Sequence, residues 1–313
     1  MSQELRVMRY EFRKKVGKII TKVGLLVFVC LPVSAKALQI QDFALGTVNN
    51  GLTAESYIVI DRHSGNVLMQ KDAGVVRVPA SLTKLVTALV VLDMNPKLTG
   101  KVSMKKSDEV GGARLATKAG VSYKVADLFS AMLIASANNA TNALARSGGI
   151  TKEEFVEKMN QKAVSLGAIN TRFVEPTGIS EFNQSTAEDL AKIALQAFSA
   201  PHILLASQKE NYSFRAVNNK RYLHKLKNTN KLLKDGELEI IAGKTGYLDE
   251  SRYNFTALVR DQFNQESIIA LMGAQDTSAQ FRETKQLAFL GGLVKQLEFL
   301  SGGVLGTSTI ITK

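Results

Sequence analysis

The sequence predicts an α+β fold in which strands from both ends of the 313-residue chain join one sheet, with a helical subdomain inserted at about 95–235. Residues 57–61 and 67–70 are β-rich runs on either side of a polar turn, a pattern typical of a β-hairpin. Apolar residues at helical spacing dominate the middle of the chain. The last third returns to short β-rich runs, at 238–242, 255–259 and 268–272.

The predicted helices follow from the same spacing. Residues 82–92 are apolar on nearly every side, which is typical of a buried helix. Ser185 and Glu188 form a capping-box pattern at the start of a later one. The further predicted helices span 125–134, 138–146, 151–166, 185–198 and 279–297.

Residues 1–37 have the composition of a secretory signal peptide. Basic residues are followed by a short apolar core at 23–31 and by small residues at Ala35 and Ala37, where cleavage is expected. The core is shorter than the roughly 20 residues that a membrane span needs. We therefore expect residues 1–37 to be a leader, 38–300 the folded domain and 301–313 a short tail. An uncleaved N-terminal anchor is the alternative.

Export would place the protein in the periplasm or the cell-wall space and narrows the possible chemistry. Cys30, the only cysteine, lies in the leader, so a mature chain would contain no disulfide, cysteine nucleophile or zinc-thiolate site. Residues 1–37 carry eight Lys or Arg and two Asp or Glu, which leaves +6 of the net charge of +12. That balance suits an anionic polymer or a membrane surface, although solubility is its ordinary explanation. We expect no nucleic-acid partner, because no basic stripe with interleaved aromatic residues is visible.

A candidate nucleophile and its base lie at the start of the buried helix. Ser81 and Lys84 are three residues apart, so their side chains share one helix face. Burial in an apolar helix disfavours the charged form of lysine and lowers its pKa. A neutral Lys84 can accept the hydroxyl proton of Ser81, which would activate the serine. A second Ser-x-x-Lys pair, Ser103 and Lys106, lies in a polar stretch and is not favoured.

Two more motifs follow in a characteristic order. Ser136-Ala137-Asn138 lies at the break between two predicted helices, where helix capping is its ordinary explanation. A second Ser-x-Asn triplet, at 64–66, falls in the hairpin turn. Gly243-Lys244-Thr245-Gly246 ends the β-rich run from Leu238. The order Ser-x-x-Lys, Ser-x-Asn, Lys-Thr-Gly is the signature of penicillin-binding proteins and class A β-lactamases.

The chain resembles the low-molecular-mass penicillin-binding proteins, which are serine D-alanyl-D-alanine carboxypeptidases and endopeptidases. The resemblance covers about residues 45–300 and includes four segments, at 79–85, 170–178, 227–233 and 243–247. It implies a β-lactamase/DD-peptidase-like fold, with a mainly antiparallel sheet between helices and the active site beside a helical subdomain. Residues 38–300 would then be the peptidase domain.

The resemblance also implies roles for particular residues. Ser81 would be the acylated nucleophile and Lys84 its base, while Ser136 relays a proton and Asn138 holds the substrate amide. The oxyanion hole would consist of the backbone N–H groups of Ser81 and Tyr247. Lys244 and Thr245 would bind the terminal carboxylate of the substrate, and Gly246 would allow close approach of the backbone. Lys244 is also expected to lower the pKa of Lys84 by repulsion.

The expected partners are peptidoglycan stem peptides and their cross-links, with β-lactams as inhibitors. No cofactor, metal or nucleic acid is expected, nor a stable membrane anchor beyond the leader. Ala137 and Asn139 depart from the glycine and the acidic residue that are common in the family. Only about sixteen residues follow Leu297, without the C-terminal domain and amphipathic helix of many carboxypeptidases, and this favours endopeptidase or mixed activity.

Alternatives remain. A class A-like β-lactamase needs a glutamate that activates water, and Glu175 lies in the peptidase-like sequence FVEPTG instead. A nucleotide-binding loop would need glycine at position 238, which is leucine. A Ser-His-Asp triad has little support, because none of the three histidines neighbours a candidate nucleophile. A non-catalytic peptidoglycan-binding protein is a further alternative.

Overall fold

The computed structural model describes residues 51–234, 236, 238–300 and 310–312. The predicted leader, residues 1–37, lies outside the described residues. A six-stranded sheet forms the lower half of the molecule, in the order β10-β2-β1-β9-β8-β7. Its strands are β1 (Ser56–Asp61), β2 (Val67–Lys71), β7 (Glu239–Leu248), β8 (Arg252–Arg260), β9 (Glu266–Ala274) and β10 (Ile310–Thr312).

The sheet joins both ends of the chain, as the sequence predicts. β1 pairs antiparallel with β2 on one side and with β9 on the other, and β7, β8 and β9 continue the antiparallel pairing. β10, which lies within the predicted tail, pairs in parallel with β2 at the edge. The fold class is confirmed: it is a mixed α+β fold with a mainly antiparallel sheet.

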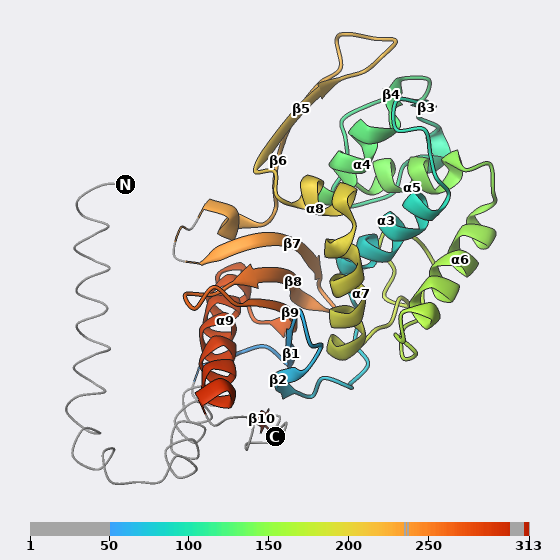
Figure 1. Ribbon diagram of the computed structural model, residues 1–313. Helices are drawn as coiled ribbons and strands as arrows, with labels where there is room; N and C mark the ends of the chain where they lie inside the picture. Colours follow the sequence, from blue (N-terminus) through green and yellow to red (C-terminus); the bar gives the residue numbers. More distant parts are fainter. Residues whose placement is uncertain (1–50, 235, 237, 301–309, 313) are drawn as a thin grey trace, which may run out of the picture.

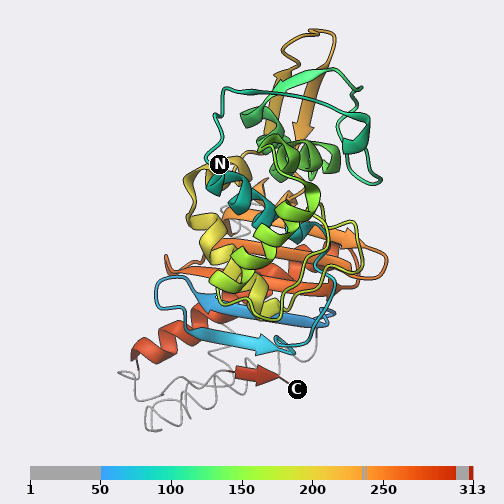
Figure 2. The same ribbon diagram turned by 90° about the vertical axis from the view of Figure 1, so that its right-hand side faces the viewer.

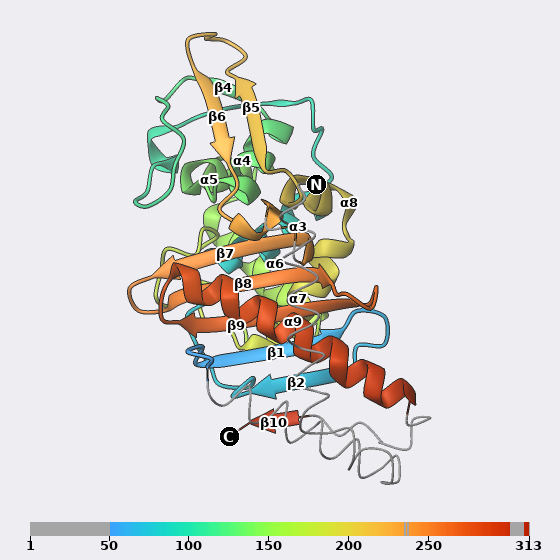
Figure 3. The same ribbon diagram turned by 90° about the vertical axis from the view of Figure 1, so that its left-hand side faces the viewer.

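Helices cover both faces of this sheet. α9 (Thr277–Leu300) lies across one face, while α7 (Ala187–Ser199) packs against β1, β8 and β9 on the other (Figures 1 and 3). Two apolar cores result. One joins the sheet to α9 through side chains such as Phe255 and Leu287, and the other joins it to the helical region through side chains such as Leu85 and Phe198.

The inserted region is helical at its centre. It contains α4 (Val125–Ile134), α5 (Asn138–Ser147), α6 (Lys152–Ser165), α7 and α8 (Pro201–Ser207), and it packs on α3 (Lys84–Asp93). α7 begins one residue later than a cap at Ser185 would place it. The side chain of Thr186 accepts a hydrogen bond of 3.0 Å from the backbone N–H of Asp189 instead.

Two small antiparallel sheets also lie in the inserted region, where the sequence predicts helices and polar stretches only. β3 (Lys101–Ser103) pairs with β4 (Ser122–Lys124). β5 (Asn211–Arg215) pairs with β6 (Leu223–Lys227) in a hairpin that projects from the end of the molecule (Figures 1 and 2). β3 and β4 have only three residues each, and β5 and β6 are rich in polar residues, so none of the four shows the β-rich run from which the other strands are predicted.

No single helix within the described residues is long and apolar enough to cross a membrane. The bent pair α7 and α8 passes that test only when its members are taken together, and the two helices meet at 97°.

Candidate active site

The predicted nucleophile and base meet where a short 3₁₀ turn, η1 (Ala80–Thr83), leads into α3. Ala80 has a φ of +48°, a left-handed conformation that costs free energy for a residue with a side chain. This turn leaves Ser81 half-buried, while Lys84, the first residue of α3, is completely buried. Lys84 Nζ lies 2.9 Å from Ser81 Oγ, as the predicted spacing requires.

Lys84 Nζ has three oxygen neighbours. Besides Ser81 Oγ, it contacts Asn138 Oδ1 at 2.7 Å and the backbone carbonyl of Thr177. An amide oxygen and a carbonyl oxygen accept hydrogen bonds but cannot donate them. A neutral amine that donates its two hydrogens to these two oxygens directs its lone pair at Ser81. The surroundings of Lys84 therefore favour the proton acceptor that the mechanism needs.

Burial lowers the pKa of Lys84 from 10.5 to about 7, and the nearby carboxylate of Glu175 partly offsets this effect. A substantial fraction of Lys84 is thus neutral at neutral pH. An ordinary exposed lysine would be almost fully charged there.

Ser136 and Asn138 reach the same site from the break between α4 and α5. Ser136 has a φ of +58° and accepts a hydrogen bond of 2.9 Å from Lys244 Nζ. Asn138 uses its oxygen for Lys84 and donates from Nδ2 to the carbonyl of Gly111 at 2.7 Å. Both ends of the Asn138 side chain are thus engaged by protein groups, so it positions Lys84 in this structure.

The two departures from the family pattern are accommodated without disturbing these contacts. Ala137 is buried in the apolar core. Asn139 is fully buried and bridges the backbone of Leu115 through its Oδ1 and Nδ2, at 2.9 and 3.0 Å. Asn139 also donates to Glu109 Oε1 at 3.0 Å. It thereby fixes the segment at 109–115, whose Gly111 carbonyl holds Asn138.

Strand β7 supplies the opposite wall. The predicted triplet lies inside this strand, and β7 continues to Leu248. A Cβ at Gly246 would lie 3.0 Å from the carbonyl of Pro79 and 3.2 Å from the backbone nitrogen of Ser81, so glycine permits the close approach of strand and turn. Thr245 donates to Thr229 Oγ1 at 2.7 Å. Tyr247 is half exposed at the rim.

Two buried lysines, Lys84 and Lys244, contribute to the site. Burial lowers the pKa of Lys244 well below its ordinary value, and repulsion from Lys84 lowers it further. The pKa of Lys84 is lowered mainly by burial. Repulsion between two ammonium groups is mutual, so the expected contribution of Lys244 to this lowering stays a prediction.

The loop at 175–183 holds residues whose roles the motifs do not reveal. Glu175 accepts hydrogen bonds from the backbone of Thr177 and Gly178, at 2.7 and 2.6 Å, and from Asn183 at 2.8 Å. The Thr177 carbonyl then reaches Lys84. Gly178 has a φ of +79°, and a Cβ there would lie 2.0 Å from the carbonyl of Ala80. The resemblance over 170–178 pointed to this loop, but only the structure shows what it contacts.

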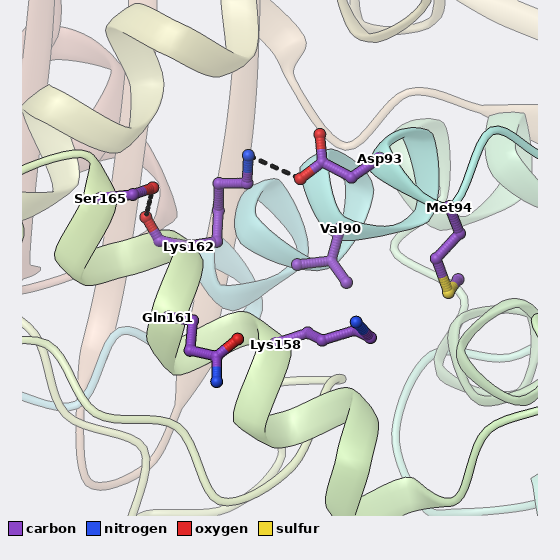
Figure 4. A pocket seen from close by; sticks show the side chains of 7 residues that line it. All are labelled: Val90, Asp93, Met94, Lys158, Gln161, Lys162 and Ser165. Atoms are coloured by element: carbon purple, nitrogen blue, oxygen red, sulfur yellow. Dashed lines mark hydrogen bonds and ion pairs between the residues drawn. The ribbon is translucent and has the colours of Figure 1, made fainter.

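Other features fall outside the site. A surface pocket lies between α3 and α6, where Lys162 Nζ pairs with Asp93 at 2.6 Å (Figure 4). Asp93 ends α3 and Lys84 begins it, so nine residues of helix, about 13 Å, separate them. The second Ser-x-x-Lys pair begins in β3, and the second Ser-x-Asn triplet lies in the β1–β2 turn.

A family model described as D-alanyl-D-alanine carboxypeptidase matches residues 44–276. The chain belongs to this family. It is 32% identical over 244 residues to a D-alanyl-D-alanine endopeptidase of Haemophilus influenzae, covering 77% of this chain and 82% of that protein. It is 33% identical to the D-alanyl-D-alanine carboxypeptidase DacF of Bacillus subtilis over 75% of this chain, but this match spans only 62% of DacF.

Solved structures show the same relationship. A D-alanyl-D-alanine carboxypeptidase of Mycobacterium tuberculosis superposes with a TM-score of 0.68 at 29% identity, over 80% of this chain and 92% of that one. The Streptomyces K15 DD-transpeptidase gives 0.73 at 26% identity, over 77% and 98%. The predicted family and fold are confirmed, and the protein is a serine-type D-alanyl-D-alanine peptidase.

Proposed function

We propose that this protein hydrolyses D-alanyl bonds in peptidoglycan stem peptides through an acyl-enzyme on Ser81. This proposal rests on the surroundings of Lys84. Burial favours its neutral amine, and hydrogen bonds to Asn138 and the Thr177 carbonyl direct that amine at Ser81 Oγ. A lysine held in this way is suited to general-base activation of a serine.

In the acylation step, Ser81 Oγ attacks the carbonyl carbon of the penultimate D-alanine and its proton passes to Lys84. The carbon–nitrogen bond then breaks, and the proton that Lys84 accepted passes to the leaving amine through Ser136, whose hydroxyl accepts a hydrogen bond from Lys244 at 2.9 Å. The acyl ester remains on Ser81. The backbone N–H groups of Ser81 and Tyr247 would stabilise the oxyanion. Ser81 lies in η1 and Tyr247 in β7, and these two elements are in contact.

We assign substrate positioning to β7. Lys244 and Thr245 would bind the carboxylate at the end of the stem peptide. Because Lys244 is buried with a lowered pKa, an incoming carboxylate would favour its charged form and draw a proton to the site. Binding and protonation would then be coupled.

Water completes the cycle by attacking the acyl ester, which regenerates Ser81. The β-lactamase alternative would assign the activation of this water to Glu175. However, the carboxylate of Glu175 accepts hydrogen bonds from Thr177, Gly178 and Asn183, so it is occupied in holding its loop. The peptidase is therefore the function we favour, with β-lactams acting as inhibitors that form a slowly hydrolysed acyl-enzyme.

The proposed setting is the periplasm or the cell-wall space, reached with the leader at 1–37. The relatives include both endopeptidases and carboxypeptidases. Because the relatives are of both kinds, we propose that this chain cleaves cross-links as well as terminal D-alanine.

The test uses residues 38–313 with two soluble substrates, a stem peptide that ends in D-Ala-D-Ala and a cross-linked peptide dimer. Mass spectrometry of the products distinguishes release of D-alanine from cleavage of the dimer. Ser81→Ala should abolish both reactions, while Ser103→Ala, in the second Ser-x-x-Lys pair, should leave both unchanged. Hydrolysis that survives in Ser81→Ala would contradict the proposal.

A further inference from the structure

The β5–β6 hairpin presents a basic outer face. Its strands alternate regularly, so that six side chains point outward and are exposed. Cross-strand pairs place Ser213 opposite Lys225 and Arg215 opposite Leu223. The six outward residues are Asn211, Ser213, Arg215, Leu223, Lys225 and Lys227.

The charge of this face is not balanced by its neighbours. Residues 211–227 contain five Lys or Arg and no Asp or Glu. Among the residues that the structure describes, Arg215, Lys225 and Lys227 form no ion pair. Three cations on one short face repel one another, which favours an anionic partner.

The inner face of the hairpin is firmly anchored, so the basic face has a fixed position. Tyr212 donates to Asp127 Oδ1 of α4 at 2.7 Å. The ring of Phe214 lies edge-on to that of Tyr123, with centroids 5.6 Å apart. His224 Nε2 lies 2.9 Å from the hydroxyl of the same Tyr123, in β4. A surface held by packing and hydrogen bonds can present charges at defined spacings without a large entropic cost.

The hairpin is also continuous with the wall of the active site. Lys227 ends β6, and two residues later Thr229 accepts the hydrogen bond of Thr245 at 2.7 Å. Asn228 closes the base of the hairpin by donating to the carbonyls of Ser207 and Lys209, at 3.2 and 2.9 Å. Five residues of β6 extend about 17 Å away from this point. The hairpin therefore begins beside the wall of the active site, where Thr229 contacts Thr245.

We propose that this outer face is a docking surface for polymeric peptidoglycan, whose neighbouring stem peptides contact Arg215, Lys225 and Lys227 through their carboxylates. The inference rests on the proposed function and deepens it. The site would cleave one stem while the hairpin holds others of the same polymer, so the enzyme prefers the intact polymer to single soluble peptides.

The chemistry of the face favours this polymer over a lipid surface. Leu223 is the one large apolar side chain among the six outward residues. Asn211 and Ser213 offer hydrogen bonds beside the cations, as recognition of a peptide requires. A membrane-binding face would combine its cations with several apolar side chains that enter the bilayer.

The experiment compares residues 38–313 with the triple variant Arg215→Gln/Lys225→Gln/Lys227→Gln. The matched control, Lys152→Gln/Lys158→Gln/Arg172→Gln, removes the same charge from exposed residues on or beside α6. Sedimentation with purified sacculi measures binding, and kcat/KM is measured on sacculi and on a soluble stem peptide. Vesicles containing an anionic phospholipid provide a second binding partner.

We expect the hairpin variant to bind sacculi about tenfold more weakly, because each exposed ion pair contributes modestly. Its kcat/KM on sacculi should fall accordingly, while the soluble peptide is cleaved at the parental rate. Raising the salt concentration should weaken the binding of the parent in the same way.

Three results would overturn the inference: unchanged binding of sacculi by the hairpin variant, an equal loss in the control variant, or a loss of vesicle binding alone. If the parent cleaves neither sacculi nor the soluble stem peptide, the proposed function is refuted instead. The sedimentation result would still decide whether the hairpin binds the polymer.

Discussion

Acylation of Ser81 should become faster as the pH rises from 6 to 8, because Lys84 must lose a proton before it can accept one from Ser81. With a pKa of about 7, the neutral fraction of Lys84 rises from about 9% at pH 6 to about 91% at pH 8. The rate constant for acylation should therefore increase about tenfold over these two pH units.

The assay is the second-order rate of labelling by a fluorescent penicillin, stopped with denaturant and measured on a gel across pH 5.5 to 9. Lys84→Arg is the informative variant, since a guanidinium stays protonated throughout this range. It should label far more slowly, without a rising limb near pH 7.

Histidines titrate in the same range and need a control. His63 and His202 are exposed, in the β1–β2 turn and in α8, so His63→Gln/His202→Gln should keep the parental profile. A rate that is independent of pH, or that rises only near the ordinary pKa of lysine, would refute the assignment of Lys84 as the base. A limb that disappears in the histidine variant would refute it too.

Three further predictions follow from the geometry and the charges of the site. Gly178→Ala should lower the free energy of unfolding by about 2–4 kcal/mol, because the added Cβ would collide with the Ala80 carbonyl and residue 178 has a positive φ. The control Gly120→Ala also has a positive φ but lies in open space, and it should cost only about 1 kcal/mol. Equal losses of the two variants in urea denaturation would contradict the collision with Ala80. Relative to Lys84→Met, the parent should gain about 4 kcal/mol of stability between pH 7 and 10.5, because the unfolded chain binds the proton that folded Lys84 has lost. A pH-independent difference would show that this lysine is not desolvated. When a stem peptide binds to Ser81→Ala, Lys244 should take up a proton. Calorimetry detects this uptake because the heat of binding then depends on the ionisation enthalpy of the buffer. A heat that is the same in all buffers would contradict the coupling of carboxylate binding to protonation of Lys244.

Much of the fold could be predicted because its elements are long or strongly periodic. The helix at 125–134 has the predicted boundaries. The runs 255–259 and 268–272 are the cores of β8 and β9, while the run 238–242 covers only the beginning of β7, which continues to Leu248. The β5–β6 hairpin could not be found in the same way. Its strands are short, and their alternation becomes meaningful only when Tyr212, Phe214 and His224 are seen to pack against α4 and β4.

The motifs predicted which side chains meet, but not what holds them. Ser81 and Lys84 are close in sequence, so their contact follows from helix geometry. The contact between Lys84 and the Thr177 carbonyl joins residues 93 positions apart, and no local pattern encodes it. The lowered pKa values of Lys84 and Lys244 likewise depend on burial, which the sequence does not specify.

The most direct test of the account is to locate the covalent bond itself. Residues 38–313 would be labelled with a fluorescent penicillin, digested, and mapped by mass spectrometry. The account predicts one labelled peptide with the adduct on Ser81, and no label in Ser81→Ala. An adduct on another residue, or full labelling of Ser81→Ala, would contradict the acyl-enzyme on Ser81.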